Sequence, residues 1–79
     1  MTEVRNEIES IIRRTFDYDG PIADDMTTDD VDGWDSLGHV TLILMIERAL
    51  GIRFTESERD NLANVGELVS LARAKALAR

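Results

Sequence analysis

An acidic segment gives way to an amphipathic one within a single stretch of this chain, Gly33-Trp34-Asp35-Ser36-Leu37-Gly38-His39-Val40. This change predicts a helix that begins at Ser36. Unpaired backbone N–H groups and the positive end of the dipole at a helix start favour a phosphate. Ser36 is therefore a candidate site for a phosphodiester, with Asp35 as the better N-cap once the serine oxygen is esterified. On position alone, the simpler interpretation is that Ser36 only caps the helix.

Apolar spacing predicts an all-α fold of three main helices and one short helix, and nothing in the pattern suggests strands. The first helix carries one apolar stripe at spacings of three and four residues, Val4, Ile8, Ile11, Ile12 and Phe16. Pro21 ends this helix because proline disfavours helical geometry at the residue before it. A capping box of Thr55 and Glu58 predicts a short helix to about residue 62, and Asn64 with Glu67 marks the start of the last helix.

The second helix, predicted over 36–50 and ended by Gly51, is apolar on two sides. The side expected to face the core carries Val40, Ile43, Ile46, Glu47 and Leu50. The opposite side carries Leu37, Thr41, Leu44 and Arg48, with Leu42 and Met45 between the two. A surface helix needs only one apolar stripe. The second side belongs either to the core or to a contact surface.

The net charge of −7 is concentrated in one segment. Residues 17–35 hold eight aspartates and no Lys or Arg, whereas the rest of the chain holds eight acids and nine bases. Nucleic-acid binding is disfavoured because it needs a basic face, and an acidic patch suits basic partners instead. The candidates for such recognition are Asp29, Asp30, Asp32 and Asp35, and the alternative is a solvated acidic loop with no partner. Loops of this length are uncommon inside a domain, and Ile22, Met26 and Val31 are expected to pack it against the core.

Length and composition limit the architecture. Seventy-nine residues, 43% of them hydrophobic, predict one domain over 1–79 with one small core. The absence of cysteine excludes disulfides and thiolate metal sites, and no metal site is expected. The longest apolar run, 42–46, is far below the roughly 20 residues that span a bilayer, and residues 1–14 lack the apolar stretch of a secretory signal. We therefore expect a soluble cytoplasmic protein.

Two other chemistries fit the central stretch poorly. Ser36 and His39 are neighbours on a helix, but the Gly-x-Ser-x-Gly pattern of a hydrolase and its preceding strand are missing. His39 is accordingly expected to face a partner or to pack against the loop. A calcium loop aligned on Gly33 places Thr28 at the first ligand position and His39 at the twelfth, where a glutamate is required.

The stretch and the order of helices resemble the acyl carrier proteins, small domains modified on the serine of an Asp-Ser-Leu motif. The matching residues are Gly33, Asp35, Ser36, Leu37, Val40 and the run Asn64-Val65-Gly66-Glu67-Leu68. The resemblance covers almost the whole chain and implies a four-helix bundle with a long first loop. It also implies that Ser36 receives 4′-phosphopantetheine from coenzyme A through a Mg²⁺-dependent transferase. The thiol of that arm would hold an acyl group as a thioester, and the chain itself would catalyse nothing.

The resemblance further implies a monomer that meets a phosphopantetheinyl transferase, a loading ligase or acyltransferase, and a ketosynthase or other acyl-processing enzyme. The implied contact residues are Asp30, Asp32, Leu37, Val40, Thr41, Leu44 and Arg48. The tryptophan-containing motif is similar to that of freestanding carriers in polyketide and other specialised pathways. Glu47 is the only acid after the serine in the second helix, unlike many fatty-acid carriers. An aminoacyl or peptidyl carrier and an unmodified helical interaction module remain open alternatives.

Overall fold

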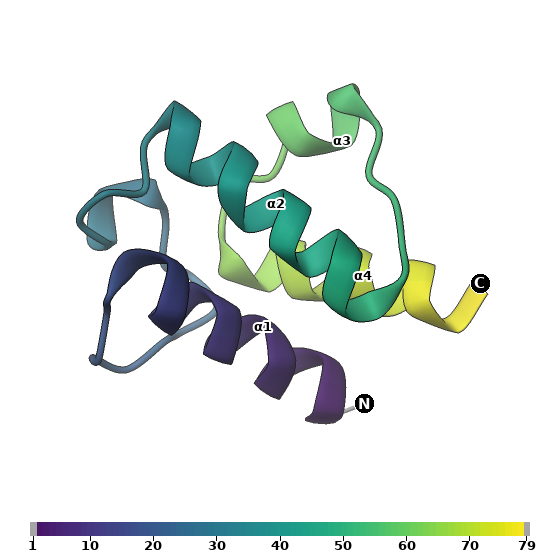
Figure 1. Cartoon of the computed structure of the whole chain (residues 1–79), viewed down its shortest axis with the longest axis horizontal. Coiled ribbons are helices and arrows are strands. Elements are labelled where there is room, and N and C mark those ends of the chain that lie inside the picture. Colours follow the sequence, from purple (N-terminus) through teal and green to yellow (C-terminus); the bar gives the residue numbers. More distant parts are fainter. Residues whose placement is uncertain (1, 79) are drawn as a thin grey trace.

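Four α-helices form where the apolar spacing predicts them, in the arrangement of Figure 1. The structure, a computed structural model, describes the backbone of residues 2–78 and the side chains of residues 4–78, so residues 1 and 79 of the expected domain lie outside it. The helices are α1 (Thr2–Phe16), α2 (Ser36–Leu50), α3 (Glu56–Asp60) and α4 (Val65–Ala78), and a 3-10 turn, η1 (Thr28–Asp30), precedes α2. No strand occurs within residues 2–78, which confirms the all-α prediction.

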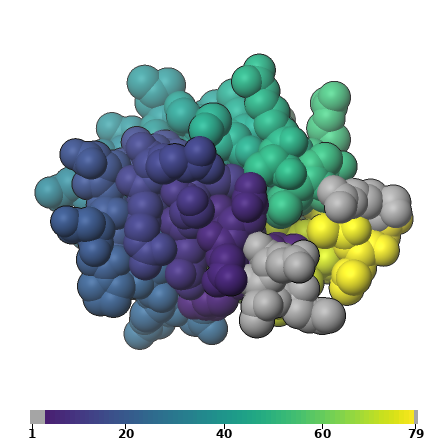
Figure 2. Space-filling model, turned by 60° about the horizontal axis from the view of Figure 1, so that its bottom comes forward, coloured from purple at the N-terminus to yellow at the C-terminus, as the bar shows by residue number. Residues whose placement is uncertain are grey.

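One hydrophobic core joins three of the helices. α1 packs against α2 and α4 and runs in the direction opposite to both (Figure 1). With α1 turned toward the viewer, the segment that follows it lies on one side and α4 on the other (Figure 2). The buried side chains of the helices are Ile8, Ile11, Ile12, Leu42, Ile43, Ile46, Val65, Leu68, Val69 and Ala72. In the part of the chain that the structure describes, no helix has the length and apolarity needed to cross a membrane.

The helix α3 is held by polar contacts, since none of its five residues is buried. The predicted capping box is present: the Thr55 hydroxyl accepts from the Glu58 N–H, and the Glu58 carboxylate accepts from the Thr55 N–H. The hydrogen bond from the Thr55 N–H lowers the pKa of Glu58 the most. The ion pair with Lys75 of α4, at 2.9 Å, lowers it further. The helix ends at Asp60 rather than near residue 62, because Asn61 caps it by donating to the Ser57 carbonyl.

The first connection, residues 17–35 between α1 and α2, is packed along its length. Val31 is buried, and Ile22 and Met26 are partly buried against the core, as expected. Trp34, which we expected to anchor the loop while partly buried, is buried. The sequence analysis did not find the turn η1. This turn is stabilised by a capping box between Thr27 and Asp30, in which the Asp30 carboxylate accepts from the Thr27 N–H. Its three residues are too few to show an apolar period.

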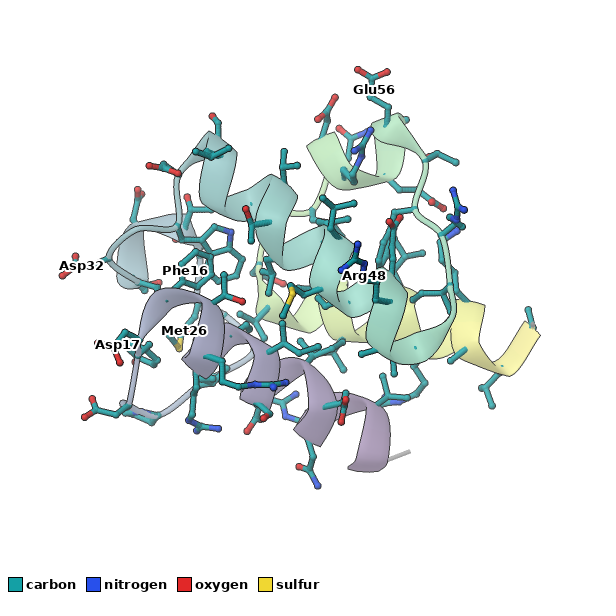
Figure 3. The ribbon with its side chains drawn as sticks, viewed as in Figure 1. Phe16, Asp17, Met26, Asp32, Arg48 and Glu56 are labelled. Carbon is teal, nitrogen blue, oxygen red and sulfur yellow. The ribbon has the colours of Figure 1, made fainter. Side chains whose placement is uncertain are left out.

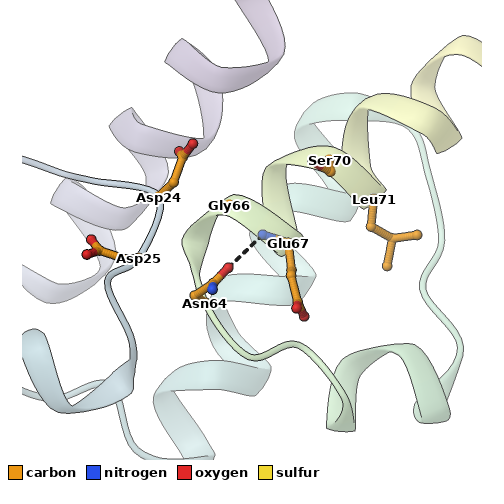
Figure 4. A pocket seen from close by; sticks show the side chains of 7 residues that line it. All are labelled: Asp24, Asp25, Asn64, Gly66, Glu67, Ser70 and Leu71. Carbon is orange, nitrogen blue, oxygen red and sulfur yellow. Dashed lines mark hydrogen bonds between the residues drawn. The ribbon is translucent and has the colours of Figure 1, made fainter.

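The first connection also docks on the start of α4 (Figure 4). The carbonyls of Met26 and Asp24 accept from the N–H groups of Val65 at 2.9 Å and Gly66 at 2.8 Å. These are the first two residues of α4, whose N–H groups have no acceptor within the helix. A Cβ at Gly66 would lie 3.0 Å from the Asp24 Cβ, a tight contact, so the close approach favours a glycine. Asp24 in turn bonds Arg5 of α1, which ties three segments together.

The rotation of α2 differs from the prediction for two residues. Val40, expected on the core side, is 43% exposed, whereas Leu42, expected between the two sides, is fully buried. At about 100° per residue, Leu42, Ile43 and Ile46 lie within one arc of the helix, and Val40 falls outside it. The apolar residues on both sides of α2 left this rotation undetermined, and packing against α1 sets it.

The substitution Gly38→Ala tests how closely the start of α2 approaches the first connection and the end of α1. A Cβ at Gly38 would collide with the Gly33 carbonyl oxygen and lie 2.8 Å from Phe16 Cε1, so we expect the free energy of unfolding to fall by about 1–3 kcal/mol. Urea denaturation followed by circular dichroism measures this change. In an exposed helical position, alanine is more stable than glycine by about 1 kcal/mol. The control Ala49→Gly, at an exposed position of the same helix, measures this intrinsic difference. A stabilised Gly38→Ala protein would contradict the close approach of the loop.

Candidate functional site

Ser36 is the first residue of α2, and its side chain is exposed. The N-cap is Asp35, whose carboxylate accepts from the Gly38 N–H at 2.9 Å. The Ser36 hydroxyl makes no hydrogen bond among the described residues. The interpretation of Ser36 as a capping serine is therefore wrong, and its oxygen is free for chemistry at the positive end of the helix.

Behind Ser36, Trp34 and His39 link the first connection to α2 and α3. The Trp34 indole is 6% exposed and stacks on Phe16, with ring centroids 5.4 Å apart. Its N–H donates to His39 Nδ1 at 3.0 Å, and His39 Nε2 lies 3.1 Å from the Arg59 carbonyl. An indole N–H only donates and a carbonyl only accepts. Both bonds therefore require a neutral His39 with its proton on Nε2.

Ser36 opens onto a hollow between η1, the start of α2, and α3, which we call the Ser36 hollow. Trp34 and His39 form part of its wall, Val40 lines its α2 side, and Arg59 lines its α3 side. His39 thus packs against the loop, which is one of the two roles expected for it, and also contacts α3. The structure brings Asp35, Ser36 and Val40 together in this hollow.

The side of α2 opposite the core forms an outer stripe, defined as Leu37, Thr41, Leu44 and Arg48. All four side chains are exposed, Leu37 by 76% and Leu44 by 51%. Figure 3 shows Arg48 on this outward side. Glu47 does not add a free acid to it, because its carboxylate accepts from the Phe54 N–H at 2.8 Å. The stripe is therefore apolar and ends in a cation.

The acidic residues of the first connection have different surroundings. Asp30 is engaged in the cap of η1, and Asp35 caps α2. Asp32 is exposed, bonds no other described residue, and lies at the outer edge of the connection (Figure 3). Within residues 2–78 no group of three or more His, Asp or Glu side chains is arranged to hold a metal ion.

An all-α bundle whose long first connection presents an exposed serine at the head of the second helix has the layout of a small carrier domain. The solution NMR structure of a holo acyl carrier protein from Geobacter metallireducens matches 95% of this chain and 87% of its own, with 33% identity and a TM-score of 0.87. A putative acyl carrier protein from Mycobacterium tuberculosis, 24% identical over 90% of this chain and 96% of its own, has the same fold with a TM-score of 0.83.

No family model matches the chain, and a search of curated proteins returns no match. The likeness to the Geobacter protein is sufficient in identity and coverage to assign the family. This chain belongs to the acyl carrier proteins, as the motif around Ser36 predicted. Its fold is accordingly that of a carrier that works with acyl-processing enzymes.

Arg59 is the residue near Ser36 that sequence reasoning missed. It lies in a short charged helix with no apolar period, 23 positions beyond the serine, so no spacing connects the two. The sequence contained only a weak indication of the hydrogen bond between Trp34 and His39. The two residues flank the predicted start of α2, where the loop must turn back toward the helix.

A test of the link is the substitution His39→Phe, which keeps an aromatic ring but removes both hydrogen bonds. The buried Trp34 N–H would lose its acceptor, so we expect the free energy of unfolding to fall by about 1–3 kcal/mol. Urea titration read by tryptophan fluorescence measures the loss. Thr41→Ala is the matched control, because the exposed Thr41 hydroxyl bonds only the Leu37 carbonyl of its own helix. Equal stability of His39→Phe and the parent would show that the hydrogen bonds contribute nothing.

Proposed function

We propose that this chain carries 4′-phosphopantetheine on Ser36 and tethers acyl intermediates for partner enzymes, without catalysing their reactions. The observation that supports this most is the exposed, unbonded Ser36 hydroxyl at the head of a helix that another residue, Asp35, already caps. Similarity to a holo acyl carrier protein at 33% identity supports the same group on this chain. When attached, the arm supplies a thiol that holds the acyl group as a thioester.

The residues around Ser36 fit such a group. The N–H groups of Ser36 and Leu37 begin α2 and have no acceptor within the helix. Together with the helix dipole they favour an anionic phosphodiester. The exposed Leu37 leaves the outward approach to the serine open. Asp35 directs its carboxylate to the Gly38 N–H, which keeps this acid bonded within the helix start.

The outer stripe supports a carrier for polyketide or other specialised acyl assembly. Its partners would be a phosphopantetheinyl transferase, a loading ligase or acyltransferase, and a ketosynthase or other acyl-processing enzyme. Leu37, Leu44 and the neighbouring Val40 offer them apolar surface, and no free acid lies on the stripe. Asp32 offers the negative charge that steers a basic transferase. We further propose that the protein acts as a cytoplasmic monomer.

The attachment is tested by incubating the protein with coenzyme A, Mg²⁺ and a broad-specificity phosphopantetheinyl transferase. Intact-mass spectrometry is expected to detect one added phosphopantetheine on the parent and none on Ser36→Ala, because the esterified oxygen is missing. Ser70→Ala removes another exposed serine, on α4, and is expected to be modified like the parent. An unmodified parent, or a modified Ser36→Ala protein, would refute the proposal and favour an unmodified interaction module.

Charge recognition by the first connection is tested by Asp32→Lys. We expect modification to slow several-fold at low salt, with a smaller difference at high salt, because steering by exposed charges is screened. Asp30→Lys would also disrupt the η1 cap, so it is not the cleaner variant. Asp19→Lys makes the same charge change elsewhere in the first connection and is the control. Initial rates that do not respond to Asp32→Lys would remove this residue from recognition.

A further inference from the structure

The Ser36 hollow contains one arginine among several acids. Among the described residues, Arg59 is the only Lys or Arg that lines it, whereas the acidic lining residues are Asp29, Asp35, Glu56 and Asp60. One of these acids, Asp35, is already bonded to the start of α2. The hollow as a whole is negative, so its single guanidinium is a local exception.

The Arg59 guanidinium has no partner among the described residues. Its Nε atom is buried without a hydrogen bond, and only the backbone N–H and carbonyl of Arg59 form hydrogen bonds. The neighbouring Glu58, by contrast, pairs with Lys75 at 2.9 Å. A guanidinium carries five N–H donors in a planar fork. Leaving such a group partly buried and unpaired costs free energy that an anionic oxygen would offset.

A hydrogen bond links the backbone of Arg59 to the helix that Ser36 begins. Its carbonyl oxygen lies 3.1 Å from His39 Nε2, and His39 stands three residues after Ser36 on the same helix. His39 is itself held by the Trp34 indole at 3.0 Å. The backbone of α3 is therefore tied to the first turn of α2, and Arg59 lines the hollow from the α3 side.

We propose that Arg59 binds the phosphodiester of the arm attached to Ser36, an inference that rests on the proposed function. The guanidinium donates N–H···O hydrogen bonds to the phosphate oxygens and satisfies its unpaired donors. The four surrounding acids repel free anions, so the hollow does not collect phosphate from solution. A phosphate tethered at Ser36 overcomes this repulsion because its effective concentration at the hollow is high.

The test compares apo and modified forms of the parent, Arg59→Gln and Arg59→Lys by thermal melting and by ³¹P NMR, after intact mass has established modification. We expect modification to raise the parent's melting temperature by about 4 °C, and the Arg59→Gln temperature by less than a quarter of that shift. Arg59→Lys keeps the charge without the fork and is expected to fall between them. The ³¹P resonance of the arm should move between the parent and Arg59→Gln. Arg53→Gln, an exposed arginine outside the hollow, is the control and should behave like the parent.

Each outcome has a distinct meaning. Modified Arg59→Gln that matches the parent in both the melting shift and the ³¹P resonance overturns this inference alone. A melting shift of the apo parent with inorganic phosphate places the anion in solution rather than on the arm and also overturns it. If Arg59→Gln does not fold, Arg59→Lys decides by the same two measurements. Failure of the parent to gain mass overturns the proposed function together with this inference.

Discussion

The buried indole of Trp34 determines where Ser36 stands. It stacks on Phe16 at the end of α1 and on His39 of α2, whose ring centroid lies 6.2 Å away, and its N–H donates to the same histidine. A buried indole needs both an apolar surface for its ring and an acceptor for its N–H. One side chain thus joins the end of α1, the last turn of the first connection and the start of α2, and His39 extends the link to the Arg59 carbonyl.

The helices were predictable from the chain because each has a local signal. The stripe in α1, the capping box before α3, Asn64 before α4, and Gly51 with its φ of 66° all correspond to features of the structure. The rotation of α2 was not predictable, because a helix that is apolar on two sides has no single periodic face. The sequence predicted Asp35 as a neighbour of Ser36, because the two residues are adjacent in the chain. It did not predict Arg59 as a neighbour, because only folding brings α3 close to the serine.

Acidic composition described the first connection only in part. Three aspartates of this segment have different structural roles. Asp24 bonds Arg5, and its carbonyl accepts a hydrogen bond from α4. Asp30 belongs to the cap of η1, and Asp35 caps the start of α2. A carboxylate that accepts backbone N–H groups at a turn is a structural element whatever its charge does at long range. The count of eight aspartates in this segment therefore overstates the number of acids that are available to a partner.

The absence of buried side chains in α3 has a consequence for local unfolding. Detaching this helix breaks its ties to Lys75 and His39 but uncovers little apolar surface, whereas opening α1, α2 or α4 would expose the shared core. Segments with few buried apolar groups open at the lowest free energies. We therefore expect the amide hydrogens of α3 to exchange with solvent through a sub-global opening, and those in the core-facing turns of α1, α2 and α4 to require unfolding of the whole domain.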